Sequence, residues 1–223
     1  MEKALTSELS GNRIDVCPVG ALTAKPAAFH ARSWEYKKTD SIDVMDALGT
    51  NIQVHARGGE VMRIVPRVND DVNEEWLSDK GRLSIDGLKR RRLDRPWVRV
   101  NGKLISVPWK DALVALARRL DGVPGEKIGA IAGDLCDVES MCALKDLLVA
   151  LGSSSFDCRQ DGAWYDTSSR SGYLFNSDIT GIDQADALLI VGSMPRHEAP
   201  VLNARIRKRF LDAGRGDFPG GVI

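Results

Sequence analysis

The sequence has few side chains that bind metals or iron–sulfur clusters. It holds four cysteines and three histidines in 223 residues, and no two cysteines form a Cys-x-x-Cys pair. A tetranuclear iron–sulfur cluster needs four ligands, commonly thiolates from such closely spaced runs. The sequence therefore excludes a complete cluster site built on one local run of its own cysteines.

The sequence also lacks a long hydrophobic run and an excess of charge of either sign. No apolar stretch reaches the about 20 residues of a membrane-spanning helix, and the first eight residues lack the apolar core of a signal peptide. Lysine plus arginine (31) balance aspartate plus glutamate (31), so no global field attracts nucleic acid or anionic lipid. We expect no nucleic-acid partner, no direct membrane insertion and reduced thiols in a cytosolic-type compartment.

Cys17 has the most informative surroundings of the four cysteines. Pro18 follows it, and the small-residue turn Val19-Gly20-Ala21 comes next. Ferredoxin-like sequences often present an isolated cluster thiolate before a proline in this way, since proline prevents a helix from continuing. The residues alone leave two interpretations open: an ordinary buried thiol, or one ligand of a cluster whose other ligands lie elsewhere.

The next part of the chain predicts a small β-rich unit. Residues 1–30 show little periodicity. Two alternating runs, 51–57 and 61–66, flank the turn residues Gly58-Gly59-Glu60 and predict a β-hairpin. We expect a further strand within 34–44, and a short helical turn over 73–81 that ends at Gly81.

From residue 96 the period changes, after a hairpin with Asn101-Gly102 at its turn. Strands that alternate with helices then predict an α/β domain with a doubly wound parallel sheet, which stops after few strands. We expect helices over 109–120, 139–151 and 199–213, strands over 127–133 and 186–192, and short strands near 155–158 and 217–223. The leucines of the first helix, Leu113, Leu116 and Leu120, share one face. In the second helix we expect four leucines to face inward: Leu144, Leu147, Leu148 and Leu151.

Three polar groups are candidates for chemistry. His197 and Glu198 form either an acid–base pair or a helix cap, and no nucleophile motif stands nearby. The run 157–162 lines a cleft or forms a turn, with Cys158 in a packing role. The arginine-rich stretch 203–209 is expected to pair with acidic neighbours.

Three stretches go beyond composition. Residues 13–26 read RIDVCPVGALTAKP, residues 66–82 read PRVNDDVNEEWLSDKGR, and residues 196–208 read RHEAPVLNARIRK. Together they closely resemble the large iron–sulfur subunit of NADH-quinone oxidoreductase, respiratory complex I, over about residues 10–215. Cys17 matches the fourth, sequence-remote thiolate of a 4Fe–4S cluster in that family, whose other three ligands are absent from this sequence.

The resemblance implies the end of an iron–sulfur region at 1–30, a small β-rich domain at 31–92 without its cysteines, and a partial molybdopterin-oxidoreductase-like α/β domain at 93–223. It implies an electron-transfer subunit that relays electrons from NADH and FMN, held on a partner, through clusters toward quinone, coupled to proton pumping. The parent family also carries a 2Fe–2S and a second 4Fe–4S cluster, and no molybdopterin. Isolated, this chain is expected not to be catalytic.

The implied partners are other peripheral-arm subunits of complex I, including the NADH/FMN-binding subunit. The implied location is peripheral, on the cytoplasmic face of the bacterial inner membrane or the matrix side of the mitochondrial one. One rival is a molybdopterin-dependent oxidoreductase fragment, which needs cysteines in the small domain that are missing between residues 34 and 96. The other is a docking module without a redox centre.

Overall fold

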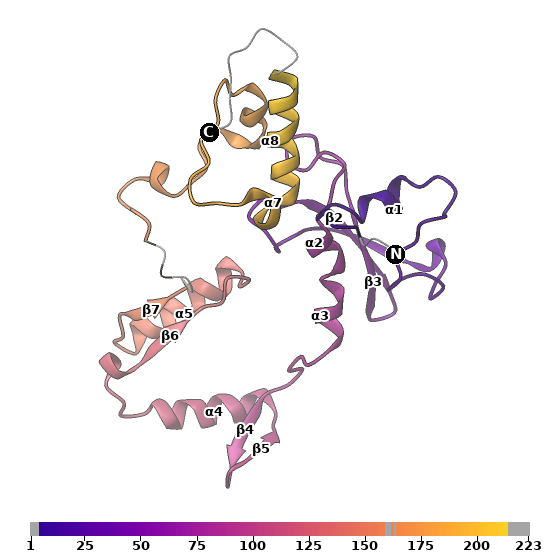
Figure 1. Cartoon of the computed structure of the whole chain (residues 1–223). Helices are drawn as coiled ribbons and strands as arrows, with labels where there is room; N and C mark the ends of the chain where they lie inside the picture. The colour runs from indigo at the N-terminus through magenta and orange to yellow at the C-terminus, as the bar shows by residue number, and fades with distance from the viewer. Residues whose placement is uncertain (1–4, 159–161, 163, 214–223) are drawn as a thin grey trace. The chain divides into compact units, whose positions relative to one another are not determined.

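The structure, a computed structural model, describes residues 5–158, 162 and 164–213 (Figure 1). The chain divides into two units. Unit 1 comprises residues 1–90 and 173–223, and unit 2 comprises residues 91–172. Two stretches with sequence predictions, 159–161 in the polar run and the strand expected at 217–223, lie outside the described residues.

Unit 1 is built on an antiparallel sheet of three strands, β1 (Lys37–Ile42), β2 (Asn51–Arg57) and β3 (Glu60–Pro66), in the order β1-β2-β3. The predicted hairpin and the strand before it are confirmed. Gly58, with a φ of +61°, adopts the left-handed conformation that the tight turn between β2 and β3 requires. A register shift between His55 and Ala56 interrupts the β2–β3 pairing.

The core of unit 1 lies between this sheet and the segment that follows it. Ile52 and Ile64 pack with Leu77 and Ile85, and all four are buried. Leu77 comes just before α2 (Asp79–Leu83), and Ile85 begins α3 (Ile85–Lys89). Apolar residues at every second strand position and on the adjoining short helices therefore close a small core.

The prediction of a helical turn over 73–81 is wrong in its bounds. Residues 69–76 form turns held by a β-bridge between Asn69 and Glu74, and α2 starts only at Asp79. The Ser78 hydroxyl accepts the N–H of Gly81 and caps α2, so Gly81 lies inside the helix instead of ending it. The cap, which a serine supplies, determines where this helix begins.

The first thirty residues contain a helix that the sequence analysis did not predict, α1 (Asn12–Val16), and a 3₁₀ turn, η1 (Ser33–Glu35), follows. The C-terminal part of unit 1 is helical. It contains α6 (Asp178–Gly181), the 3₁₀ turn η4 (Ile182–Gln184), α7 (Pro195–Glu198) and α8 (Pro200–Ala213).

One of the two predictions for this C-terminal part needs correction. Among the described residues, the segment 186–192 forms no strand. Within this segment only Leu188 takes part in a β-bridge. An extended apolar segment becomes a strand only when neighbouring backbone completes its hydrogen bonds. The helix expected at 199–213 is confirmed as α8, whose buried residues are Pro200, Val201 and Arg205.

Unit 2 begins with the predicted hairpin of β4 (Trp97–Val100) and β5 (Lys103–Ser106). Asn101 and Gly102 both have positive φ, as the Asn-Gly turn requires. The helices expected over 109–120 and 139–151 are confirmed as α4 (Trp109–Leu120) and α5 (Val138–Ala150). Two 3₁₀ turns, η2 (Gly125–Lys127) and η3 (Arg170–Gly172), were not predicted.

Two short strands of unit 2, β6 (Gly129–Ile131) and β7 (Ser155–Asp157), pair in parallel across α5. They form the predicted parallel sheet, which has these two strands among the described residues. The fold class, an α/β chain with a small antiparallel sheet followed by the start of an α/β domain, is therefore confirmed.

The apolar face of α4 is left uncovered among the described residues. No residue of α4 is buried, and Leu113 and Leu116 are 57% and 49% exposed. Of the α5 leucines expected to face inward, Leu148 is buried and Leu144 is partly buried, as is Leu151 just after the helix, but Leu147 is 47% exposed. Helical spacing groups apolar side chains on one face, but burial also needs a second surface. Across the described residues, no helix has the length and hydrophobicity to cross a membrane.

Candidate functional site

Cys17 ends α1 in a conformation that its neighbour Pro18 favours. Its backbone is extended, with φ −71° and ψ 108° at the C-terminal cap. A residue before proline avoids the helical region because the proline ring would clash with it. The helix therefore stops at Val16, and the next residues turn away from it with Gly20 in the left-handed region at φ +65°.

The loop after Cys17 directs backbone amides toward its sulfur. Hydrogen bonding by the Leu22 amide, then by those of Val19, Ala21 and Gly20, lowers the pKa of the Cys17 thiol from its ordinary value. Successive N–H groups of this kind form concave anion sites, which occur around phosphates and iron–sulfur centres. The loop thus stabilises negative charge on sulfur, as in a free thiolate or a metal-bound one.

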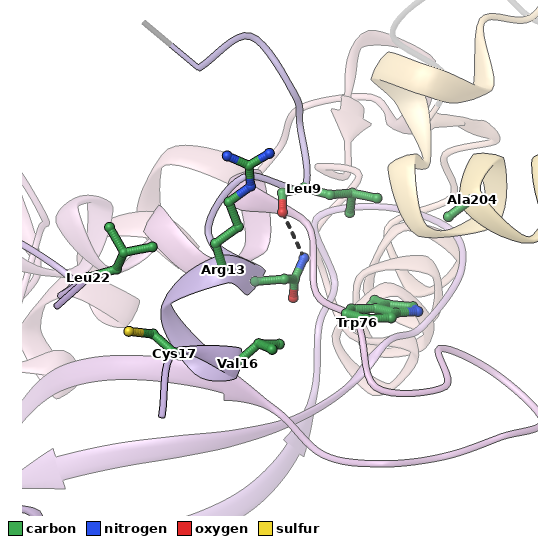
Figure 2. Close-up of a pocket in the computed structure, with 8 residues that line it drawn as sticks. Leu9, Arg13, Val16, Cys17, Leu22, Trp76 and Ala204 are labelled. Carbon is green, nitrogen blue, oxygen red and sulfur yellow. Dashed lines mark hydrogen bonds between the residues drawn. The ribbon is translucent and has the colours of Figure 1, made fainter. Parts of the chain in front are cut away.

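The Cys17 side chain borders a largely apolar cavity of about 570 Å³. Figure 2 shows Cys17 and Leu22 at one end of this cavity, and Trp76 and Ala204 at the other. The lining is completed by Leu9, Asn12, Arg13 and Val16. Segments far apart in sequence therefore meet around the thiol, which lies partly exposed at the edge of the cavity.

The helix that carries Cys17 is fixed to the segment before α2 by a buried asparagine. The Asn12 amide donates to the Leu77 carbonyl at 2.8 Å, and its oxygen accepts the Leu77 N–H at 3.0 Å. The same amide also donates to the Leu9 carbonyl, as the dashed line in Figure 2 shows. Asn12 and Leu77 are 6% and 0% exposed, so these bonds replace water.

Two charged residues of α2 hold α1 from both ends. The Asp79 carboxylate accepts the N–H groups of Ser10 and Gly11 and so caps the start of α1. The Arg82 guanidinium donates to both oxygens of Asp15, near the end of α1. These contacts fix a helix of five residues that would be unstable in isolation.

His197 and Glu198 do not form the acid–base pair considered from the sequence. His197 Nδ1 instead lies 3.1 Å from a Glu8 oxygen, and Arg196 Nε donates to the other Glu8 oxygen at 2.9 Å. The Arg196 hydrogen bond holds the pKa of Glu8 below its usual value. Glu198, the last residue of α7, accepts the Ser193 hydroxyl and the Met194 N–H just before the helix.

The basic residues of α8 pair with acidic neighbours, as expected. Arg205, 5% exposed, donates to Asp183 at 2.6 Å and to the Asp70 carbonyl at 2.6 Å. Lys208 Nζ lies 2.6 Å from Glu74, and its hydrogen bond lowers the pKa of that carboxyl. These contacts join α8, which lines the cavity through Ala204, to the turns at 69–76.

The other three cysteines lie in unit 2, and all are exposed. Cys142 and Cys158 border a second cavity of about 330 Å³ beside α5 and β7. Within the described ranges, no group of three or more histidine, cysteine, aspartate or glutamate side chains is arranged to hold a metal ion. The described residues therefore do not supply the ligand set of a complete iron–sulfur cluster. Cys17 is suited to be one ligand of such a set.

The sequence analysis selected Cys17 but missed Asn12, Asp79 and Arg82, which hold its helix. Asn12 and Asp15 stand three positions apart, a spacing that places both on one side of a helix. This spacing was present in the sequence, but a helix of five residues is too short to be distinguished from a loop by spacing alone.

Three family models match the chain. The model described as Molybdopterin oxidoreductase matches residues 92–219. The model described as NADH-ubiquinone oxidoreductase NDSU1/NuoG-like, 4Fe-4S domain, matches residues 36–86. The model described as NADH-quinone oxidoreductase subunit 3, ferredoxin-like domain, matches residues 1–23, which include Cys17. Residues 36–86 contain no cysteine in this chain.

Curated relatives match nearly the whole chain. The matching subunit of NADH-quinone oxidoreductase in Rickettsia conorii is 56% identical over 94% of this chain and 31% of its own length. The mitochondrial NADH dehydrogenase [ubiquinone] iron-sulfur protein 1 of Solanum tuberosum is 54% identical over 93% of this chain and 28% of its own length. The mitochondrial 78 kDa subunit of NADH-ubiquinone oxidoreductase from Neurospora crassa is 53% identical over 100% of this chain and 30% of its own length.

Proposed function

Because this chain belongs to the molybdopterin oxidoreductase family and, within it, to the large iron–sulfur subunits of NADH-quinone oxidoreductase, we propose that it acts as part of an electron-transfer subunit. The chain spans about a third of the length of the curated relatives it matches. Its contribution is then one stretch of a longer electron path. The isolated chain would not be a catalyst.

The observation that carries this proposal is the environment of Cys17. The thiol lies at the end of an anchored helix, beside an apolar cavity, with the amides of 19–22 lowering its pKa. Cys17 would supply the fourth thiolate of a 4Fe–4S cluster, and three further thiolates would come from outside this sequence. When bound, such a cluster accepts and releases single electrons.

This chain's own residues would hold the ligand and tune its charge. The amide groups after Cys17 stabilise negative sulfur, which favours a more positive reduction potential for any centre bound there. Leu9, Val16 and Trp76 place apolar surface beside the thiol. The contacts of Asn12 and Arg82 fix the position of α1 and hence of the sulfur.

We divide the chain for this function into residues 1–30, the end of a cluster-binding region, residues 31–92, a small β-rich domain, and residues 93–223, a partial molybdopterin-oxidoreductase-like domain. No role for molybdopterin is included. The longer subunit would also hold a 2Fe–2S and a second 4Fe–4S cluster.

The proposed partners are other subunits of the peripheral arm of complex I, among them the one that binds NADH and FMN. Electrons would pass from there toward quinone, coupled to proton pumping by the whole complex. The proposed location is peripheral, on the cytoplasmic face of the bacterial inner membrane or the matrix side of the mitochondrial one.

The experiment that tests the ligand is electron paramagnetic resonance at low temperature. The chain is expressed with the coding sequence upstream of it, purified without oxygen and reduced with dithionite. We expect Cys17→Ala to remove the signal of one tetranuclear cluster while those of the 2Fe–2S and second 4Fe–4S clusters remain, and the matched control Cys136→Ala to leave all of them in place. A complete set of signals in Cys17→Ala, equal to that of the unchanged chain, would show that Cys17 is a packing residue and not a ligand. No signal in any form would favour a docking module without a redox centre.

A further inference from the structure

Gly11, the residue just before α1, has no space for a side chain. A Cβ at this position would lie 2.6 Å from Arg82 Nε, 2.7 Å from Arg82 Cδ and 2.8 Å from Asp79 Oδ1. Real Cβ atoms essentially never come within 3.0 Å of another heavy atom. The backbone of Gly11 is helical, with φ −65° and ψ −22°, so its conformation does not require glycine. The close approach of two side chains of α2 requires it instead.

The Arg82 side chain cannot move away from Gly11 without loss. Arg82 is 6% exposed, and its guanidinium donates to both oxygens of Asp15 and to Asn12 Oδ1 at 3.1 Å. The two atoms that a Cβ would strike, Cδ and Nε, lie in the middle of the side chain, behind this bonded end. A displaced Arg82 would therefore break bonds at a buried charge, which is costly.

The Asp79 carboxylate is held equally firmly. Its Oδ1 accepts the N–H of Gly11 itself at 2.7 Å. Its Oδ2 accepts the N–H of Ser10 at 3.1 Å and the Ser10 hydroxyl at 2.5 Å. Moving this carboxylate would uncap the start of α1. The missing side chain of Gly11 thus lets two fixed charged groups of α2 lie directly against the first turn of α1.

The separation of α1 and α2 at Gly11 matters for Cys17 because α1 is so short. Cys17 caps the other end of the same five-residue helix, about 9 Å along the axis at about 1.5 Å of rise per residue. Ordinary contact with a Cβ starts at 3.4 Å, so the 2.6 Å approach would have to widen by about 0.8 Å. Metal–ligand distances are held to about 0.2 Å. A displacement of α1 by this amount would be several times that tolerance.

We propose that Gly11 is a positioning residue for the cluster ligand Cys17. Its lack of a side chain sets the distance between α1 and α2, and so the place of the Cys17 sulfur. Gly11 acts through Asp79 and Arg82 and supplies no ligand itself. This inference rests on the proposed function, because it concerns the same thiolate.

The stability of each cluster toward a chelator tests this role. The chain is expressed with its upstream coding sequence and purified without oxygen, and paramagnetic resonance spectra are recorded at intervals after the chelator is added. We expect Gly11→Ala to lose the signal of one tetranuclear cluster, the one that Cys17→Ala removes, roughly tenfold faster than the unchanged chain. The g values of that cluster should shift, and the other two clusters should decay at their ordinary rates.

Gly87→Ala is the matched control. Gly87 lies in the short helix α3, and a Cβ there has no heavy atom within 4 Å. Alanine also forms helices more readily than glycine. All three clusters of Gly87→Ala should therefore decay as they do in the unchanged chain.

A second substitution shows whether the close contact with Arg82 is the cause. Arg82→Ala removes two of the three atoms that a Cβ at Gly11 would strike. Adding Gly11→Ala to Arg82→Ala should therefore accelerate the loss of the cluster less than Gly11→Ala does in the unchanged chain. If Gly11→Ala alone holds no cluster, the double variant should still recover part of the signal.

Several results would overturn the inference. Equal decay in Gly11→Ala and Gly87→Ala would do so, and so would a double variant without any recovery. Faster loss of all three clusters in Gly11→Ala would indicate general instability and not positioning. These results count against Gly11 alone as long as Cys17→Ala removes one cluster. If Cys17→Ala removes none, the proposed function fails, and the role of Gly11 fails with it.

Discussion

Asn12 and Leu77 exchange two hydrogen bonds across 65 positions of sequence, at 2.8 and 3.0 Å, and so join the helix that carries Cys17 to the core of the small β-rich unit. Leu77 is at the centre of that core, next to Ile52 and Ile64. The position of the candidate cluster ligand is therefore coupled to the stability of the sheet through one asparagine side chain.

Replacing Asn12 should weaken this coupling. Asn12→Ala leaves the backbone N–H and carbonyl of Leu77 buried without partners, which costs about 2–4 kcal/mol in free energy of unfolding. Arg13→Ala, at the next position of the same helix but exposed, should change it by less than about 0.5 kcal/mol. Denaturant unfolding of both variants checks this, and equal losses would show that the asparagine is not the anchor.

Gly20 should control the reactivity of Cys17. Gly20→Ala strains the left-handed backbone at φ +65° by about 1–2 kcal/mol and displaces the amides that stabilise the thiolate. The pKa of Cys17 should then rise and its alkylation below pH 8 should slow. The measurement is the pH dependence of iodoacetamide labelling, in a chain with Cys136, Cys142 and Cys158 changed to serine.

Gly58→Ala is the matched control for that substitution. Gly58 has a similar φ of +61° and lies in the turn between β2 and β3. The substitution Gly58→Ala should strain the backbone equally and leave the labelling profile of Cys17 unchanged. A similar shift in both variants would mean that general loosening, and not loss of the amides, determines the thiol pKa.

His55 should make the chain less stable in mild acid. Burial, then the charges of Arg63 and Lys38, lower the pKa of His55 to about 4 from its usual 6.5. Arg63 Nε donates to Nδ1 at 2.9 Å, so the imidazole proton lies on Nε2 and points to Gln53. Between pH 6.5 and 4 the unfolded chain binds a proton that the folded chain does not, and the free energy of unfolding falls by up to about 3 kcal/mol.

The comparison that isolates this effect is between the unchanged chain and His55→Gln. Asp43 and Asp46 have raised pKa values and contribute in the opposite direction, toward higher stability as the pH falls. Subtracting the His55→Gln profile removes their contribution. Urea unfolding at several pH values measures both profiles, and His30→Gln, at an exposed position, should keep the full acid sensitivity.

The exposed face of α4 should make the isolated chain aggregate. Replacing Leu113 and Leu116 together with lysine should lower light scattering and dye binding, and change the free energy of unfolding by less than about 1 kcal/mol, because neither side chain is buried. Leu148→Ala should instead cost about 2–5 kcal/mol, since that side chain is 3% exposed. A double lysine variant that unfolds would show that α4 is covered in solution.

Local chemistry made several elements predictable. The Asn101-Gly102 pair supplies the positive φ angles of a tight hairpin, and alternating apolar residues predict β2 and β3. The helix α5 follows from apolar spacing, and its Asp137 caps the first turn by accepting the Ser140 N–H. Such features depend on neighbours within a few residues, so the sequence contains all the information they need.

Other features depend on residues far away in the chain. The helix α1 has five residues, too few to form alone, and it exists because Asp79, Leu77 and Arg82 satisfy its ends and side chains. His197 pairs with Glu8 and not with its neighbour Glu198, which no local pattern could indicate. The segment 186–192 has the composition of a strand, but a strand also needs a backbone partner.

By itself the sequence determined the α/β class, most helix and strand positions and the choice of Cys17, because turn chemistry, periodicity and motif residues act over short distances. Only the tertiary structure decided that Cys17 borders an apolar cavity, that Asn12 and Arg82 hold its helix, and that Gly11 has no space for a side chain. The reason is physical: burial and hydrogen-bond satisfaction are properties of surfaces that meet only when the chain folds.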